Sequence, residues 1–124
     1  MSKFYKCSVC GQMVGKIKES ACPIMCCGQP MEKLEANTTE AAFEKHIPDV
    51  KIEDHIVKVQ VGSVAHPMAE EHFIEWVYLE TDQGGARKVL KPGDKPEVCF
   101  ALCGETPKAV YAYCNLHGLW KKDL

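Results

Sequence analysis

The clearest pattern along the chain is the alternation of apolar and polar residues in HIVKVQVGSV, residues 55–64. Val57, Val59 and Val61 alternate with lysine and glutamine, which is the period of a half-buried β-strand. Four more segments are rich in β-branched and aromatic residues and are separated by turn-forming residues, namely FIEWVYLE, RKVLK, EVCFAL and AVYAYC. TDQGGAR, directly after the first of them, predicts a hairpin turn. Short strands at this spacing predict an antiparallel β-sandwich.

The first 36 residues lack this pattern and have few large apolar side chains. Five of the eight cysteines fall between Cys7 and Cys27, whereas no histidine precedes His46. A segment below ~40 residues usually needs a metal or disulfides to fold. We therefore expect two domains, 1–36 and 37–124, joined near LEANTTEAAFEKH, where TTEAAFEK predicts one or two helical turns.

Composition narrows the function classes. The chain has 124 residues, a formal net charge of −2 and a pI of about 6.2, which gives no reason to expect binding to nucleic acid. No segment approaches the ~20 apolar residues that cross a bilayer, and the N-terminus has no apolar core of a signal peptide. We therefore expect a cytoplasmic protein without a membrane partner. In a reducing cytosol, eight cysteines favour metal sites over disulfides.

The cysteine-rich segment predicts a tetrahedral metal site. CSVCG and CCGQPM each place two thiols before a glycine, and four thiolates suit zinc or iron. The ligands of this interpretation are Cys7, Cys10, Cys26 and Cys27. Adjacent side chains diverge along an extended chain, so Cys26 and Cys27 should widen one sulfur–metal–sulfur angle. Cys22 is an alternative ligand, and a disulfide-bonded segment without metal is the other alternative.

The second part of the chain predicts a different metal site. Four histidines and one cysteine stand in short polar phrases, and they are His46, His66, His72, Cys114 and His117. Five ligands are too many for a structural zinc, and imidazoles with a thiolate fit iron or copper. A Cys–His nucleophile pair oriented by Asn115 is a weaker reading, because a sequence neighbour is poor evidence for an orienting group. His55 is interpreted as a bystander.

Copper is the alternative to iron at this second site. Blue-copper proteins are also β-sandwiches with a C-terminal Cys/His loop, but they usually carry an axial methionine after that histidine. HGLWKKDL has no methionine. Two other function classes also remain open: an electron carrier without turnover, and a structural zinc protein that acts as an interaction module.

Seven phrases, CSVCG, CCGQPM, EKHIP, VGSVAHPM, EEHFIEW, LKPGDKPE and YCNLHGLWK, together resemble the desulfoferrodoxins, the two-iron superoxide reductases. They occur in order through nearly the whole chain. The resemblance implies a desulforedoxin-like Fe(Cys)4 module followed by an immunoglobulin-like β-sandwich with an Fe(His)4Cys site. It makes the four histidines equatorial ligands and Cys114 the axial thiolate.

The resemblance also implies a reaction. Superoxide would be reduced to hydrogen peroxide, with electrons from an external donor such as rubredoxin, by a homodimer. Zinc is an alternative metal for the four-cysteine site. Lys45 resembles a lysine that attracts superoxide, and Glu44 resembles a carboxylate that occupies the sixth position in the oxidised enzyme. Cys22, Cys99 and Cys103 match none of these phrases, and the last two are interpreted as small apolar core residues.

Overall fold

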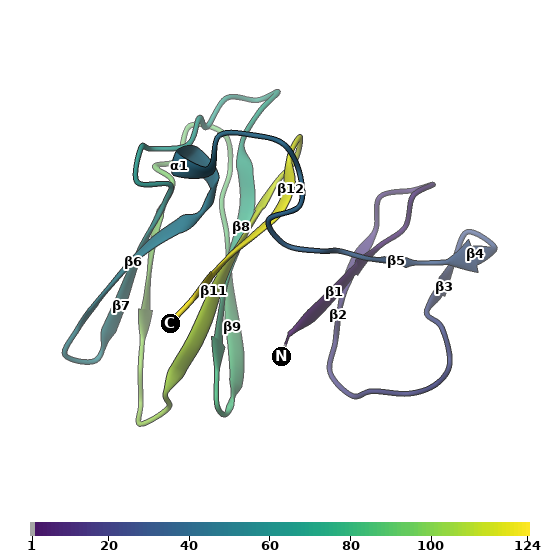
Figure 1. Ribbon diagram of the computed structural model, residues 1–124, viewed down its shortest axis with the longest axis horizontal. Coiled ribbons are helices and arrows are strands. Elements are labelled where there is room, and N and C mark those ends of the chain that lie inside the picture. Colours follow the sequence, from purple (N-terminus) through teal and green to yellow (C-terminus); the bar gives the residue numbers. More distant parts are fainter. Residues whose placement is uncertain (1) are drawn as a thin grey trace. The chain divides into compact units, whose positions relative to one another are not determined.

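The structure is a computed structural model that describes residues 2–124. The chain divides into two compact units, unit 1 (Met1–Glu35) and unit 2 (Ala36–Leu124). Both consist mainly of antiparallel strands, as Figure 1 shows, which confirms the fold class expected from the sequence. Among the described residues, none of the helices has the length and apolar character needed to span a membrane.

Unit 1 contains five short strands. Three of them form a sheet in the order β2-β1-β5, and the other two form a separate hairpin, β3-β4. Their bounds are β1 Lys3–Lys6, β2 Met13–Lys16, β3 Met25–Cys26, β4 Gln29–Pro30 and β5 Glu32–Lys33. Only Phe4, Cys7 and Met31 are buried among its described apolar side chains. An apolar core of this size does little to stabilise a fold, which agrees with the expected need for a metal.

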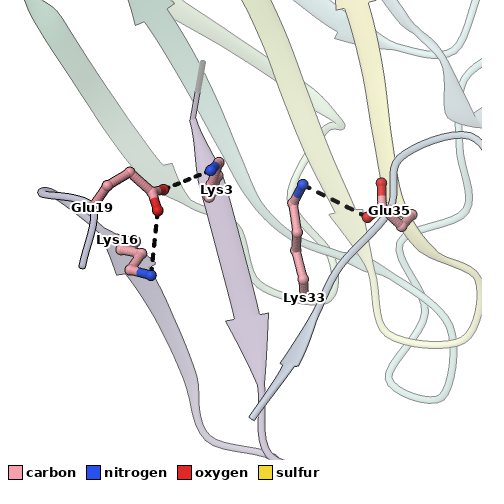
Figure 2. Close-up of polar contacts among 5 residues, drawn as sticks. All are labelled: Lys3, Lys16, Glu19, Lys33 and Glu35. Carbon is pink, nitrogen blue, oxygen red and sulfur yellow. Dashed lines mark ion pairs between the residues drawn. The ribbon is translucent and has the colours of Figure 1, made fainter. Parts of the chain in front are cut away.

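Ion pairs connect the loop after β2 to the sheet. Lys3 and Lys16 stand opposite each other on neighbouring strands, where like charges repel. Figure 2 shows Glu19 between them, with its carboxylate oxygens 2.6 Å from the Lys3 Nζ and 3.5 Å from the Lys16 Nζ. The Glu19 side chain is largely exposed, so solvent screens both pairs and each stabilises the sheet only weakly. Glu19 therefore mainly offsets the repulsion between the two lysines.

Unit 2 is a sandwich of two sheets. One sheet has the order β10-β7-β6 and the other β12-β11-β8-β9, and a short helix, α1, precedes β6. The bounds are α1 Phe43–His46, β6 Pro48–Glu53, β7 Ile56–Val61, β8 Ile74–Thr81, β9 Gly84–Val89, β10 Glu97–Ala101, β11 Pro107–Cys114 and β12 Gly118–Asp123.

The core of unit 2 lies between these sheets. The three valines of β7 are buried, as their alternation predicted, and they pack in one cluster with residues of the opposite sheet such as Ile74 and Val110. Burying side chains of this size contributes about 1.5–3 kcal/mol each. Unit 2 therefore has an apolar core that does not depend on a metal.

One sequence interpretation is wrong. Cys99 and Cys103 are exposed and are not core residues. On β10 the buried positions are Val98 and Phe100, so the period of the strand turns Cys99 outward. Cys103 lies beyond the end of the strand, where alternation no longer predicts burial.

Candidate metal centres

The histidines and the buried cysteine of unit 2 meet at one end of the sandwich. Figure 1 shows α1, the connection between β7 and β8, and the turn between β11 and β12 at the same end. His46 ends α1, while His66 and His72 lie in the β7–β8 connection. Cys114 ends β11, and His117 follows it in the turn. Three separate chain segments thus supply the donors.

The four imidazole rings form a square. Neighbouring ring centroids are 4.5 Å apart for His46–His66, 4.7 Å for His66–His72, 5.0 Å for His72–His117 and 4.9 Å for His46–His117. The planes of neighbouring rings cross at 79° to 85°. The diagonal between His46 and His72 is 6.2 Å. Rings arranged in this way direct their nitrogens at a common centre, as four equatorial ligands of one ion do.

Hydrogen bonds to the main chain fix the rings of His46 and His66. The His46 Nδ1 lies 2.8 Å from the carbonyl oxygen of Ala42, and the His66 Nδ1 lies 2.7 Å from that of Pro67. A carbonyl only accepts, so each Nδ1 carries the proton and each Nε2 keeps a free lone pair. The two Nε2 atoms are 3.1 Å apart. Both rings are therefore held in the tautomer that binds metal through Nε2.

The remaining donors complete the set. The His72 Nε2 is buried and, among the described residues, is without a hydrogen-bond partner, which suits an atom that binds a metal. The His117 Nδ1 lies 3.1 Å from the His46 Nε2 and 3.9 Å from the Cys114 Sγ. Donor atoms of His46, His72, Cys114 and His117 all lie within 4.8 Å of one another, and the His66 Nε2 adjoins them. This arrangement fits one metal ion with four nitrogens and one sulfur.

Burial sets the charge of these donors. It lowers the pKa of His46 and of His72, and it lowers the pKa of His66 to about 4, because a cation is poorly solvated there. Burial raises the pKa of the Cys114 thiol, while the N–H groups of His117 and Leu116 act in the opposite direction. The imidazoles of His46, His66 and His72 are thus neutral and ready to bind, and the Cys114 thiolate needs a cation to form.

Lys45 and Glu44 are both exposed on α1, next to His46. After burial and the other imidazoles, the charge of Lys45 also lowers the pKa of His46, and it has the same effect on His72. The Lys45 ammonium therefore acts electrostatically at the histidines. Glu44 lines a hollow of about 310 Å³ together with Phe43 and Lys122, and none of the four histidines lines that hollow.

In unit 1 the four cysteines named from the sequence form a second cluster. The Cys10 and Cys26 sulfurs are 3.6 Å apart, and those of Cys26 and Cys27 are 3.9 Å apart. Tetrahedral thiolates on a metal at about 2.3 Å have sulfurs about 3.8 Å apart. Of these two distances, that of the adjacent pair is the longer. Cys22 is exposed and lies outside this cluster.

The four thiols ionise unequally. Main-chain N–H donation, chiefly from Cys10, lowers the pKa of Cys7 to about 6. The neighbouring Cys10 thiol raises the pKa of Cys26 to about 12. Four thiolates in one cluster repel each other, so full ionisation requires a bound cation. The two clusters are consistent with two iron ions per chain, and zinc also suits the four-cysteine site.

The structure shows supporting residues that sequence reasoning missed. Trp120 is fully buried, packs 4.8 Å from the His46 ring and donates from Nε1 to the His117 carbonyl oxygen at 3.1 Å. Gly62 has a φ of 85°, and a Cβ there would collide with the carbonyl oxygens of Val64 and Lys45. Both residues stand inside phrases used for the resemblance, but nothing in the phrases shows these contacts. His55 is exposed between β6 and β7, as expected of a bystander.

Comparisons with known proteins agree with this geometry. The family model for desulfoferrodoxin matches residues 38–123, and that for the desulfoferrodoxin N-terminal domain matches residues 1–34. A desulfoferrodoxin from Syntrophotalea carbinolica is 48% identical over 119 residues, covering 96% of this chain and 94% of that protein. The crystal structure of a superoxide reductase from Treponema pallidum has a TM-score of 0.83 and 38% identity, and the match covers 99% of both chains.

A smaller relative matches only part of the chain. A one-iron superoxide reductase from Giardia intestinalis has a TM-score of 0.56 and 31% identity. The match covers 97% of that chain but 65% of this one.

Proposed function

Because the chain belongs to the desulfoferrodoxin family, we propose that it is a superoxide reductase that acts at the histidine–cysteine site of unit 2. The net reaction combines one superoxide, one electron and two protons to give one hydrogen peroxide. The observation that carries the proposal is the square of four imidazoles with a buried thiol. When bound by these five donors, iron supplies the electron by changing between its ferrous and ferric states.

The chain controls how the site is approached. Cys114 is fully buried, so its sulfur reaches the donor square from the protein interior. His72 and His117 are half-buried and extend to the surface. A metal held by these five donors would therefore be open to a small anion on the face of the square away from Cys114. None of the four imidazoles carries a negative charge, so the thiolate is the only anionic donor of the site.

We assign Lys45 to attraction of the anionic substrate and Glu44 to the sixth position of the oxidised enzyme. The electrostatic effect of Lys45 on His46 and His72 supports the first role. Glu44 precedes Lys45 on α1 and supplies its main-chain carbonyl to the N–H of Val64, at 2.9 Å. A rotation of its side chain out of the hollow with Lys122 would be needed to approach the histidines.

We further propose that the two units are independent domains, 1–36 and 37–124, and that the four-cysteine iron does not meet the substrate. The four cysteines would supply all four ligands of a tetrahedral ion, which would leave no position for superoxide. All eight cysteines are unpaired, which supports a reducing, cytoplasmic setting. An external electron donor such as rubredoxin and a homodimer complete the proposal, and both rest on the family resemblance.

Metal analysis, visible spectroscopy and pulse radiolysis of the purified protein test the proposal together. We expect two irons per chain, a thiolate-to-iron band that appears on oxidation, and rapid consumption of superoxide with one peroxide formed per superoxide. A result of one copper per chain would favour an electron carrier, and two zincs per chain would favour a structural protein. Release of oxygen together with peroxide would indicate dismutation and contradict the proposed reductase.

A further inference from the structure

Asn115 lies between Cys114 and His117 and makes two side-chain hydrogen bonds to a distant segment. Its Oδ1 accepts from the main-chain N–H of Phe73 at 2.9 Å, and its Nδ2 donates to the carbonyl oxygen of Glu71 at 3.1 Å. Its main-chain N–H also donates to the carbonyl oxygen of Phe73, at 3.2 Å. Glu71 and Phe73 flank His72. One residue of the Cys114–His117 turn thus holds both neighbours of another metal-site histidine.

The side chain extends a strand ladder whose main-chain pairing ends with one hydrogen bond, from the Asn115 N–H to the Phe73 carbonyl oxygen. β11 pairs with β8 up to Cys114 and Ile74, and the register shifts between Tyr113 and Cys114. Beyond that pair the amide of Asn115 offers one acceptor and one donor, as a peptide group does. It therefore takes the place of the next main-chain unit and extends the pairing to the segment before β8.

His72 depends on this pairing more than the other rings do. His46 and His66 are oriented by hydrogen bonds from their own Nδ1 atoms to carbonyl oxygens. Among residues 2–124, no hydrogen bond to the His72 ring is present, and its Nε2 is buried without a partner. The remaining local support of His72 is a two-bond bridge between its main chain and that of Ala69. The orientation of the His72 ring is thus set through its main chain.

We infer that Asn115 is a positioning residue that holds His72 in register with Cys114 and His117, so that the five donors stay aligned on one ion. The amide acts through both of its polar atoms, and neither touches the metal or the substrate. Groups that orient metal ligands in this way typically change metal affinity about 10- to 100-fold when they are lost. The inference rests on the proposed metal-binding site and not on the reaction with superoxide.

Asn37 provides a matched control within the same unit. Its Nδ2 donates to the carbonyl oxygen of Lys121 at 3.1 Å, and its Oδ1 accepts from the N–H of Lys121 at 2.8 Å. Its main-chain N–H donates to the carbonyl oxygen of Leu119 at 3.0 Å. The same three-bond pattern therefore fastens a segment that carries none of the metal donors. Asn37→Asp and Asn115→Asp each lose one amide donor and add one carboxylate.

The test compares these two variants with the parent as iron-loaded proteins. We expect Asn115→Asp to release the iron of unit 2 to a chelator about tenfold faster or more, with a shifted thiolate-to-iron band. Asn37→Asp should release this iron within about twofold of the parent rate and keep the band. Its melting temperature should nevertheless fall about as much as that of Asn115→Asp. Asn115→Leu keeps the approximate shape of asparagine, removes both hydrogen bonds and adds no charge. It should release iron at least as fast as Asn115→Asp. Parent-like release and an unshifted band in both Asn115 variants, or equal acceleration by Asn37→Asp, would overturn the inference.

A measurement on the parent keeps the inference testable if the Asn115 variants do not fold. In the zinc-loaded protein, NMR should show slow hydrogen exchange for the Phe73 amide and for the side-chain amide of Asn115. If both amides exchange at the rate of exposed amides, Asn115 does not hold the segment around His72 and the inference is refuted. Because zinc binding, iron release and the band are measured without superoxide, an absence of superoxide reactivity would reject the proposed function and leave this result standing.

Discussion

In unit 1 the four thiols lie in two short segments, 7–10 and 26–27, and the buried apolar side chains among its described residues are Phe4, Cys7 and Met31. In unit 2 the donors lie at the end of a sandwich whose two sheets share a continuous apolar cluster. A metal therefore contributes to the two units differently. In unit 1 it takes the place of a core, whereas in unit 2 it is held by a fold that the core already stabilises.

The two sites also differ in how their donors are prepared. The thiols of unit 1 contact mainly one another and the adjacent main chain, and their pKa values diverge, with that of Cys7 lowered and that of Cys26 raised. In unit 2, main-chain carbonyls fix the tautomers of His46 and His66 before any metal binds. A tetrathiolate site thus forms together with its metal, while the donors of unit 2 are oriented in advance. Pre-orientation suits a site that must keep one coordination position open.

The largest expected effect comes from removing both metals. Treatment with a strong chelator should unfold unit 1, because structural metals contribute about 10–16 kcal/mol of apparent binding energy to such small domains. Unit 2 should keep its sheets, since its core remains buried. Hydrogen exchange measured residue by residue distinguishes the responses of the two units. Amides of β1 and β2 should lose protection, and those of β8 and β11 should keep it.

Zinc gives the control for this experiment. Added zinc should restore protection in unit 1 without iron, because a tetrahedral tetrathiolate site suits both ions. If β8 and β11 lose protection together with β1 and β2, the two units do not differ in the way described above.

Two cysteine variants each alter one metal centre and leave the other intact. Cys10→Ser should remove the iron of unit 1 and leave the rate of superoxide consumption within about tenfold of the parent, because the two donor sets share no residue. Cys114→Ser should abolish both the visible thiolate-to-iron band and superoxide consumption, even where iron is retained, because a serine oxygen is a much weaker donor to iron. Pulse radiolysis and iron analysis on both variants provide the measurement.

Two outcomes would contradict this assignment. A Cys10→Ser protein that retains the iron of unit 2 but reacts more than tenfold slower would place the four-cysteine iron in the reaction. Persistence of the band in Cys114→Ser would require another axial sulfur, although the remaining cysteines of unit 2, Cys99 and Cys103, are exposed.

How far the sequence predicts the structure differs between the two units. The alternation in β7 and the apolar residues of β8 and β11 give the sandwich, because burial of one strand face leaves a local pattern. β6 and β12 are not predicted, because their several exposed, charged positions leave no clear alternation of apolar and polar residues. The strands of unit 1 are too short for any period to emerge.

The donor sets are visible in the sequence, but their supports are not. Histidine and cysteine are rare and chemically specific, so short phrases identify them as candidates. The carbonyl oxygens of Ala42 and Pro67 orient two of the rings, yet every residue has such a carbonyl. Asn115 was visible as a polar neighbour of Cys114, whereas its contact with the segment around His72 exists only in the folded chain.

Acid should weaken metal-free unit 2 through His66. Burial lowers the pKa of His66 to about 4, below the ordinary value of 6.5, so the unfolded chain binds more protons between these pH values. The stability contributed by neutral His66 is therefore present above pH 6.5 and is lost as the pH falls to about 4. At about 1.4 kcal/mol per pKa unit, the loss is at most about 3.5 kcal/mol. Urea unfolding of metal-free protein at several pH values measures it.

His66→Gln is the control for this pH dependence. The variant should show a flatter decline between pH 6.5 and 4, while a decline due to His46 and His72 remains, since burial lowers the pKa of both. Unit 1 contains no histidine, so its own stability should lack this contribution. An unchanged slope in His66→Gln would mean that His66 is not held neutral by burial.

The smallest expected effect concerns Lys45. Lys45→Ala should slow the bimolecular reaction with superoxide about two- to fivefold and reduce its dependence on ionic strength, because a cation near the open position attracts a small anion and salt screens that attraction over ~8 Å. Lys51→Ala removes the same charge from an exposed position on β6 and should change neither quantity. The charge of Lys45 also lowers the pKa of His72. In the metal-free protein that pKa should therefore rise in Lys45→Ala and stay constant in Lys51→Ala. Pulse radiolysis over a salt series, together with NMR titration of the histidines, measures both effects. Equal rates and equal salt slopes in the parent and Lys45→Ala would make Lys45 an ordinary surface lysine, even if the pKa of His72 rises.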